Sequence, residues 1–209
     1  ESNDAEMIVY NMFNSGLFLF LFMAFIILYR MLYRHNVGRM IFVTLFSLYF
    51  YYKSSGIYFL LLVFVSISDY LIAHAIAGSQ DKSLKKRLVG LSVAINLAML
   101  GYFKYTNFFI EMANGLFGAG FLDFQNIFLP VGISFFVFQS MSYTIDVYRG
   151  AIKPLARWTD FLFYLSFFPQ LVAGPIVRAR NFIPQIRQTP VVAREMLGTA
   201  LFLVLTGLF

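Results

Sequence analysis

The chain has 209 residues, of which 60% are hydrophobic and only 12% carry a charge, and its mean hydropathy is +0.74. This composition excludes an ordinary soluble domain and predicts an all-α integral membrane protein, a multi-span helical bundle. The net charge of +6 does not indicate nucleic-acid binding, because the basic residues lie in short loops between apolar runs. Cysteine is absent, which excludes disulfides, a thiolate nucleophile and a cysteine metal site.

The length allows roughly six or seven crossings of about 20 residues each, so residues 1–209 are expected to form a single membrane domain. Residues 10–29 are the first apolar run, and the acidic residues 1–6 lack the basic start of a secretory signal. Basic residues follow this run: Arg30, Arg34, His35 and Arg39. The positive-inside rule places them in the cytoplasm, with the N-terminus outside.

The next apolar runs differ in length. Residues 40–52 are short for a span, whereas residues 57–77 are long enough, so a thin or re-entrant hairpin is expected. The hairpin returns to the cytoplasm at the basic residues 80–87. Residues 88–110 then cross outward to the Gly-rich residues 111–126, whose only charges are acidic.

Residues 130–148 cross inward again, and a basic loop follows them. Residues 161–177 have basic residues on both sides: Arg149, Lys153 and Arg157 before, and Arg178, Arg180 and Arg187 after. The run is also interrupted by Pro169, Gly174 and Pro175. We therefore expect a broken, re-entrant helix that enters and leaves from the cytoplasmic side. The last run, residues 196–209, is short, so we expect the chain to be part of a longer protein.

One polar stripe lies within the apolar residues 130–148. Gln139, Tyr143 and Asp146 are spaced by four and three residues and share one helix face, with Ser142 adjacent. Such a stripe either lines a substrate tunnel or makes hydrogen bonds between helices, with Asp146 paired to Arg149. Spacing alone favours the structural interpretation, because polar contacts between membrane helices are common.

Two further charges lie inside apolar runs. Asp69 is costly in lipid unless it is paired, and an ion pair with Lys104 is the expected structural solution. His35 and His74 lack a nearby partner at catalytic or metal-ligand spacing. The sequence contains no serine nucleophile motif, phosphate loop or dinucleotide glycine pattern.

Several motifs taken together resemble one family. They are residues 100–105 (LGYFKY), residues 130–135 (PVGISF), Gln139 with Ser142 and Tyr143, residues 146–149 (DVYR), and residues 168–176 (FPQLVAGPI) followed by Arg178. In this combination the chain resembles the bacterial branch of the membrane-bound O-acyltransferase (MBOAT) family. The resemblance spans most of the chain.

The resemblance implies O-acyl transfer, expected to be acetyl transfer, from a cytoplasmic donor to a hydroxyl of an extracytoplasmic polysaccharide or other envelope acceptor. The donor would be acetyl-CoA or a carrier-bound acyl group, and no bound cofactor or metal is expected. It further implies a bacterial cytoplasmic (inner) membrane location and an extracytoplasmic acyltransferase as a partner protein. The family fold is a disc of helices with funnels from both faces that meet at a thin centre.

The resemblance also suggests which residues line or brace the tunnel: Gln139, Ser142, Tyr143, Asp146, Arg149, Gln170, Gly174, Pro175 and Arg178. The family's central histidine lies in the C-terminal half, and neither His35 nor His74 matches its position. The chain is therefore expected to be the N-terminal part of a longer acyltransferase. No catalytic residue is expected within residues 1–209. Two alternatives from other classes remain open: a transporter or flippase core, and a non-catalytic membrane subunit.

Overall fold

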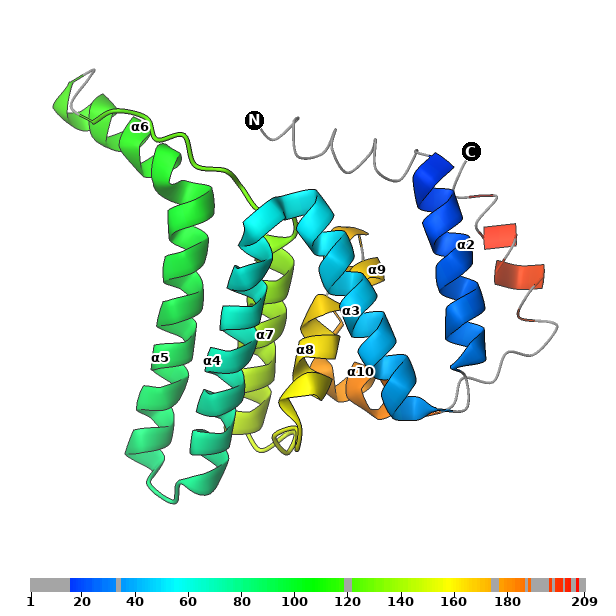
Figure 1. Ribbon diagram of the computed structural model, residues 1–209. Coiled ribbons are helices and arrows are strands. Elements are labelled where there is room, and N and C mark those ends of the chain that lie inside the picture. Colours follow the sequence, from blue (N-terminus) through cyan, green and yellow to red (C-terminus); the bar gives the residue numbers. More distant parts are fainter. Residues whose placement is uncertain are drawn as a thin grey trace.

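The computed structural model describes residues 16–32, 35–118, 122–173, 177–186 and 188, and in addition residues 196, 198–200, 202, 203 and 206. Within these ranges every regular element is a helix, as predicted (Figure 1). In chain order they are α2 (Gly16–Met31), α3 (Asn36–Ser55), the 3-10 helix η1 (Gly56–Tyr58), α4 (Phe59–Gly78), α5 (Lys82–Leu100), the π-helix η2 (Gly101–Tyr105), α6 (Thr106–Phe117), α7 (Ile133–Tyr148), α8 (Trp158–Ser166), α9 (Phe168–Ala173) and α10 (Ala179–Ile186). Two continuous helical segments, Asn36–Gly78 and Lys82–Phe117, are long and apolar enough to cross a membrane.

The short apolar run at residues 40–52 lies inside a longer helix. α3 has 20 residues because polar residues at both of its ends are also helical. At 1.5 Å per residue this helix is about 30 Å long, which matches the hydrocarbon core of a bilayer. The chain then reverses direction at η1, so that α3 and α4 form a hairpin (Figure 1).

The centre of the bundle consists of α4, α5 and α7, which pack along much of their lengths. Their facing sides carry apolar residues such as Leu62, Val65, Phe136 and Val137, all fully buried. The first turn of α5 is capped by Asp81, whose carboxylate accepts a hydrogen bond of 2.8 Å from the backbone N–H of Ser83.

A buried carboxylate joins these three helices. Asp69 of α4 accepts hydrogen bonds from the hydroxyl of Ser92 (2.6 Å) and the side-chain amide of Asn96 (2.8 Å), both on α5. It also accepts one from the hydroxyl of Ser140 on α7. All four residues are fully buried. These three donors satisfy a carboxylate that would otherwise be unstable in an apolar interior, and they fix how far α7 can slide against α4 and α5.

The expected ion pair between Asp69 and Lys104 is therefore wrong. Lys104 lies in η2 and is exposed, with its ammonium nitrogen 5.7 Å from the ring centroid of Tyr105. The sequence placed both charges in apolar runs, but neutral donors on α5 and α7 bind the carboxylate instead. An asparagine within an apolar run indicates a contact between helices, but the sequence does not show which group it binds.

The loop between α7 and α8 is attached to the bundle by side-chain hydrogen bonds. The hydroxyl of Tyr70 donates to the carbonyl of Ala156 (3.2 Å), and the indole N–H of Trp158 donates to the hydroxyl of Ser66 (3.0 Å). Because Ser66 and Tyr70 lie one turn apart on α4, these contacts fix where α8 begins.

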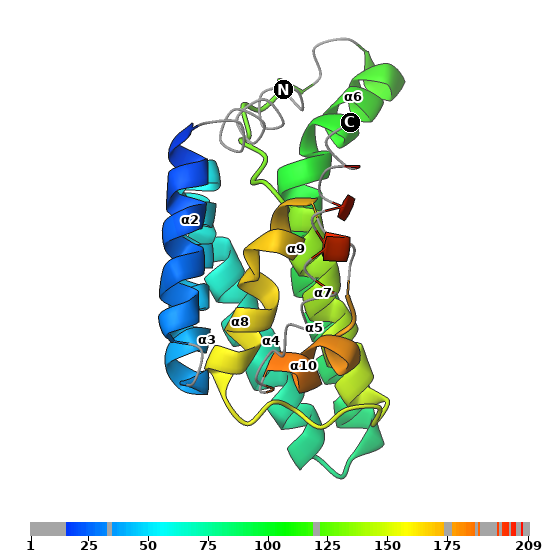
Figure 2. The same ribbon diagram turned by 90° about the vertical axis from the view of Figure 1, so that its right-hand side faces the viewer.

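The chain breaks between α8 and α9 and then turns back. α8 ends at Ser166, where Phe167 has a non-helical ψ of 103°, and Pro169 falls in the first turn of α9, where a missing N–H is tolerated. α10 returns beside α8: the rings of Phe182 and Phe163 stack 6.1 Å apart, and the hydroxyl of Tyr164 donates to the carbonyl of Val177 (2.8 Å). Both views show α10 near the end of α8 where that helix begins (Figures 1 and 2).

Candidate functional site

The polar face of α7 meets α9 through a pair of amides. The side-chain amide of Gln139 donates to the side-chain oxygen of Gln170 over 3.2 Å. Gln139 is buried and Gln170 half-buried. The structure thus brings together two of the predicted site residues, which lie 31 positions apart in the chain.

A glycine lets α9 approach α7 closely. Gly132 precedes α7 with φ +73°, in the left-handed region, and a β-carbon built on it would lie 2.4 Å from the carbonyl oxygen of Leu171. Only glycine, which has no β-carbon, leaves space here for the backbone carbonyl of Leu171. The PVGISF and FPQLVAGPI motifs are therefore in direct contact, at the first residues of one helix and the last residues of the other.

Tyr143 serves as an anchor for the backbone. Its hydroxyl oxygen accepts a hydrogen bond of 2.9 Å from the N–H of Leu155, and its ring lies 4.3 Å from that of Phe161. The side chain is fully buried. Its neighbour Ser142 is half-buried. Tyr143 thus connects the stripe on α7 to the loop before α8.

Asp146 is buried but does not form the expected pair. Within the described ranges its Oδ2 atom has no hydrogen-bond partner, and Arg149 is exposed at the end of α7. The pairing of Asp146 with Arg149 is therefore wrong, because one residue faces the interior and the other faces away from it. Arg178 is also exposed. The predicted residues Gly174 and Pro175 lie outside the described residues.

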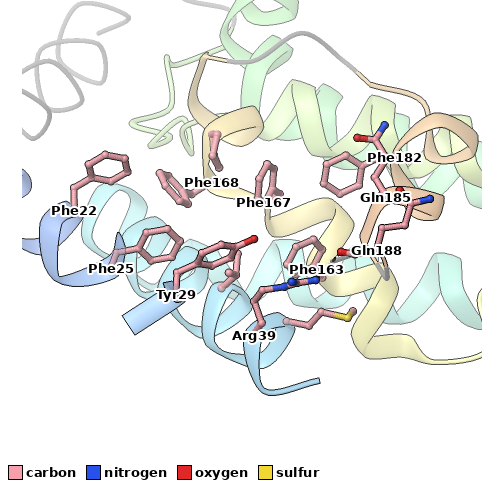
Figure 3. Close-up of a pocket in the computed structure, with 13 residues that line it drawn as sticks. Phe22, Phe25, Tyr29, Arg39, Phe163, Phe167, Phe168, Phe182, Gln185 and Gln188 are labelled. Carbon is pink, nitrogen blue, oxygen red and sulfur yellow. Dashed lines mark hydrogen bonds between the residues drawn. The ribbon is translucent and has the colours of Figure 1, made fainter. Parts of the chain in front are cut away.

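An apolar pocket lies between two parts of the chain that are distant in sequence. α2 and α3 form one wall and α8, α9 and α10 the other, enclosing about 630 Å³ (Figure 3). Its lining is mainly aromatic: Phe22, Phe25, Tyr29, Arg39, Met40, Val43, Phe163, Phe167, Phe168, Pro169, Phe182, Gln185 and Gln188. Phe25 joins the walls, since its ring lies 4.5 Å from Phe46 of α3 and 5.7 Å from Phe168 of α9.

Among the described residues of the lining, Arg39 is the one cation. Arg39 is only 4% exposed; its Nη2 donates to the carbonyl of Gln188 (2.9 Å), and its guanidinium carbon lies 5.8 Å from the ring centroid of Tyr29. An aromatic cavity of this size suits an apolar chain, and a guanidinium in its lining attracts an anionic group. Among the described residues, no three His, Cys, Asp or Glu side chains gather where they could hold a metal ion.

The sequence did not predict which residues line this pocket. None of the predicted tunnel residues that the structure describes lines the pocket, although Phe168 and Pro169 belong to one of the family motifs. Arg39 was assigned to a basic loop, yet it is the fourth residue of α3 and is buried. The four-residue spacing of Phe163 and Phe167 was an available signal, but it does not reveal which helix the two rings face.

Comparison with known proteins identifies relatives over most of the chain. It is 37% identical over 179 residues to "Probable alginate O-acetylase AlgI" of Azotobacter vinelandii (83% of this chain, 35% of the relative). It is 28% identical, over an alignment of 228 positions, to "Peptidoglycan O-acetyltransferase" of Helicobacter pylori (95% of this chain, 43% of the relative). It is 29% identical over 122 residues to "Teichoic acid D-alanyltransferase" of Lacticaseibacillus rhamnosus (50% of this chain, 30% of the relative).

These relatives all belong to the membrane-bound O-acyltransferase family. The chain is similar to the two O-acetyl-transferring relatives over most of its length and to the D-alanyltransferase over half of it. The resemblance seen in the motifs is thereby confirmed. The chain spans about a third of the length of the alginate O-acetylase. No family model matches the chain, and no solved structure matches it.

Proposed function

We propose that the chain is part of a membrane-bound O-acyltransferase that transfers an acetyl group from a cytoplasmic donor to a hydroxyl of an envelope polysaccharide. The similarity to an alginate O-acetylase over 83% of the chain is the observation that carries this proposal. The similarity to a peptidoglycan O-acetyltransferase supports the same reaction class with another envelope polymer as acceptor. An extracytoplasmic acyltransferase that takes the acyl group onward would be the partner protein.

The charges give the bundle an orientation in the proposed bacterial inner membrane. The first two turns of α5, residues 82–87, and the loop after α7 are rich in lysine and arginine, and both lie at the end of the bundle where α3 begins (Figure 1). By the positive-inside rule this end faces the cytoplasm, so the N-terminus lies outside. α8, α9 and α10 then form a re-entrant element, because α10 returns to the end where α8 begins.

In this orientation the pocket is on the path of the donor. Arg39 lies near the cytoplasmic start of α3, where it attracts the anionic phosphates of acetyl-CoA or of a carrier-bound acyl group. The aromatic lining shelters the apolar part of the donor from water. The amide pair between Gln139 and Gln170, together with the contact at Gly132, keeps α9 in place as a wall of this path.

The test is acetyl transfer to an envelope polysaccharide by the complete protein in liposomes. Gln170→Leu removes the amide that meets Gln139 and is expected to lower kcat/KM for the donor by roughly tenfold, the effect of about 1.4 kcal/mol. Gln125→Leu is the control, because Gln125 is exposed and lies in the segment that follows α6. Normal transfer by a folded Gln170→Leu protein would show that the proposed path is wrong. A complete protein without any transferase activity would refute the reaction itself.

A further inference from the structure

The helical segment that contains α5 is too long for the membrane. Lys82–Phe117 is continuous over 36 residues, or about 54 Å, whereas a bilayer core is about 30 Å thick. The basic residues 82–87 lie at the proposed cytoplasmic surface, so residues 88–105, from α5 to the end of η2, already span about 27 Å. The residues of α6 must therefore tilt, leave the membrane or lie at its surface.

The residues of η2 are typical of a membrane boundary. Tyr102 and Tyr105 are 58% and 41% exposed, and the exposed Lys104 lies against the ring of Tyr105. Tyrosine rings prefer the headgroup region, and a lysine there extends its ammonium toward water. The π-helical geometry also marks a change in the helix at this point. η2 thus places the end of the hydrocarbon core just before α6.

α6 itself is amphipathic. At 100° per residue its apolar side chains cover one side of the helix, and Asn107, Glu111 and Asn114 cover the other. Five large apolar side chains are half or more exposed: Phe108, Phe109, Met112, Leu116 and Phe117. Figure 1 shows α6 leaning away from α4 and α7, and against the described part of the chain these five side chains stay exposed.

The polar side is already occupied by the chain itself. The side-chain amide of Asn107 bonds both the N–H and the carbonyl of Gln125, at 2.9 Å each. Asn114, two turns further, bonds both backbone groups of Leu122 in the same way, at 2.8 and 2.9 Å. The segment that returns toward α7 is therefore attached along the polar side of α6. This arrangement fixes which side of α6 stays open.

We propose that α6 is an interfacial helix that lies along the membrane surface with its apolar side in the lipid. The occupant of this side is the bilayer, because the side continues the lipid-facing surface of α5 directly beyond the tyrosines of η2. A helix that continued straight across the core would bury Glu111 and the two asparagines in hydrocarbon, which is costly. Under the proposed orientation α6 lies in the outer leaflet.

Nitroxide labels on single cysteines in the complete protein in liposomes test this placement. The chain has no cysteine of its own, so labels can be placed singly, with any cysteine outside it replaced. The measured quantities are the collision rates of the label with oxygen, which dissolves in lipid, and with a nickel chelate, which stays in water. Leu116→Cys reports the apolar side and Glu111→Cys the polar side. Leu97→Cys, exposed near the middle of the span in α5, serves as the reference.

We expect the label at Leu116 to favour oxygen but to lie at a shallower depth than the label at Leu97. The label at Glu111 should favour nickel. Equal nickel collisions at Leu116 and Glu111 would overturn the proposal, because α6 would then project into water. Protection of Leu116 from both reagents would also overturn it and would indicate a protein partner on this side. These readouts depend on the membrane arrangement but not on acyl transfer, so they can fail independently of the proposed reaction.

Discussion

The contact between Gly132 and α9 gives a prediction whose size follows from the geometry. In Gly132→Ala the new methyl group would lie 2.4 Å from the carbonyl oxygen of Leu171. That atom belongs to the backbone, so no side-chain rotation relieves the clash, and α9 must move away from α7. The φ of +73° adds a second cost, because an alanine in the left-handed region is strained by about 1–2 kcal/mol.

Gly150 separates the two costs. It has the same φ of +73°, but nothing lies within 4 Å of the position that a β-carbon would take there, so Gly150→Ala introduces the strain alone. Overpacking costs typically about 1–3 kcal/mol more, so Gly132→Ala should lose about 2–5 kcal/mol and Gly150→Ala about 1–2. For a chain of this length each kcal/mol lowers Tm by about 2–4 °C, and by less in the longer complete protein, because its unfolding entropy is larger.

The assay is thermal unfolding of the complete protein in detergent, with both variants compared to the parent. The expected result is a clearly lower Tm for Gly132→Ala than for Gly150→Ala, together with reduced acetyl transfer. Adding Leu171→Ala to the Gly132 variant should not restore Tm, since the clash is with the backbone. Equal Tm values for the two glycine variants would refute the inferred close contact between α7 and α9.

Three further predictions concern other parts of the bundle. Asp69→Asn turns an acceptor of three hydrogen bonds into a group that must also donate, and should lose about 2–4 kcal/mol by thermal unfolding. Asp81→Asn is its control and should leave Tm nearly unchanged, because asparagine caps a helix as well as aspartate does. Val43→Phe should partly fill the pocket and raise KM for the donor about tenfold. Its control is Ile41→Phe, on the exposed side of α3, which should leave KM unchanged. Equal KM values for these two variants would exclude the pocket from the donor path. Asn114→Ala should speed hydrogen exchange of the backbone N–H that it binds, and unchanged exchange would contradict that contact.

Some features of the polar stripe on α7 could be predicted from the sequence. The spacing of Gln139, Tyr143 and Asp146 placed them on one helix face, and all three are buried. Their partners could not be predicted. Tyr143 bonds a loop amide and Gln139 bonds α9, because the turn after α7 and the break before α9 set where those groups lie. Periodicity describes one helix and gives no information about its neighbour.

The sequence by itself determined that the chain is helical, that its helices are apolar and that it resembles a family of membrane-bound acyltransferases. These properties depend on composition, on periodicity within one helix and on local motifs. Only the tertiary structure decided which polar groups meet. Asp69 binds donors 23, 27 and 71 positions away, and Arg39 contacts the carbonyl of Gln188, 149 positions away. Such contacts depend on how whole helices pack, because a buried polar group is stable only where another helix provides its partner.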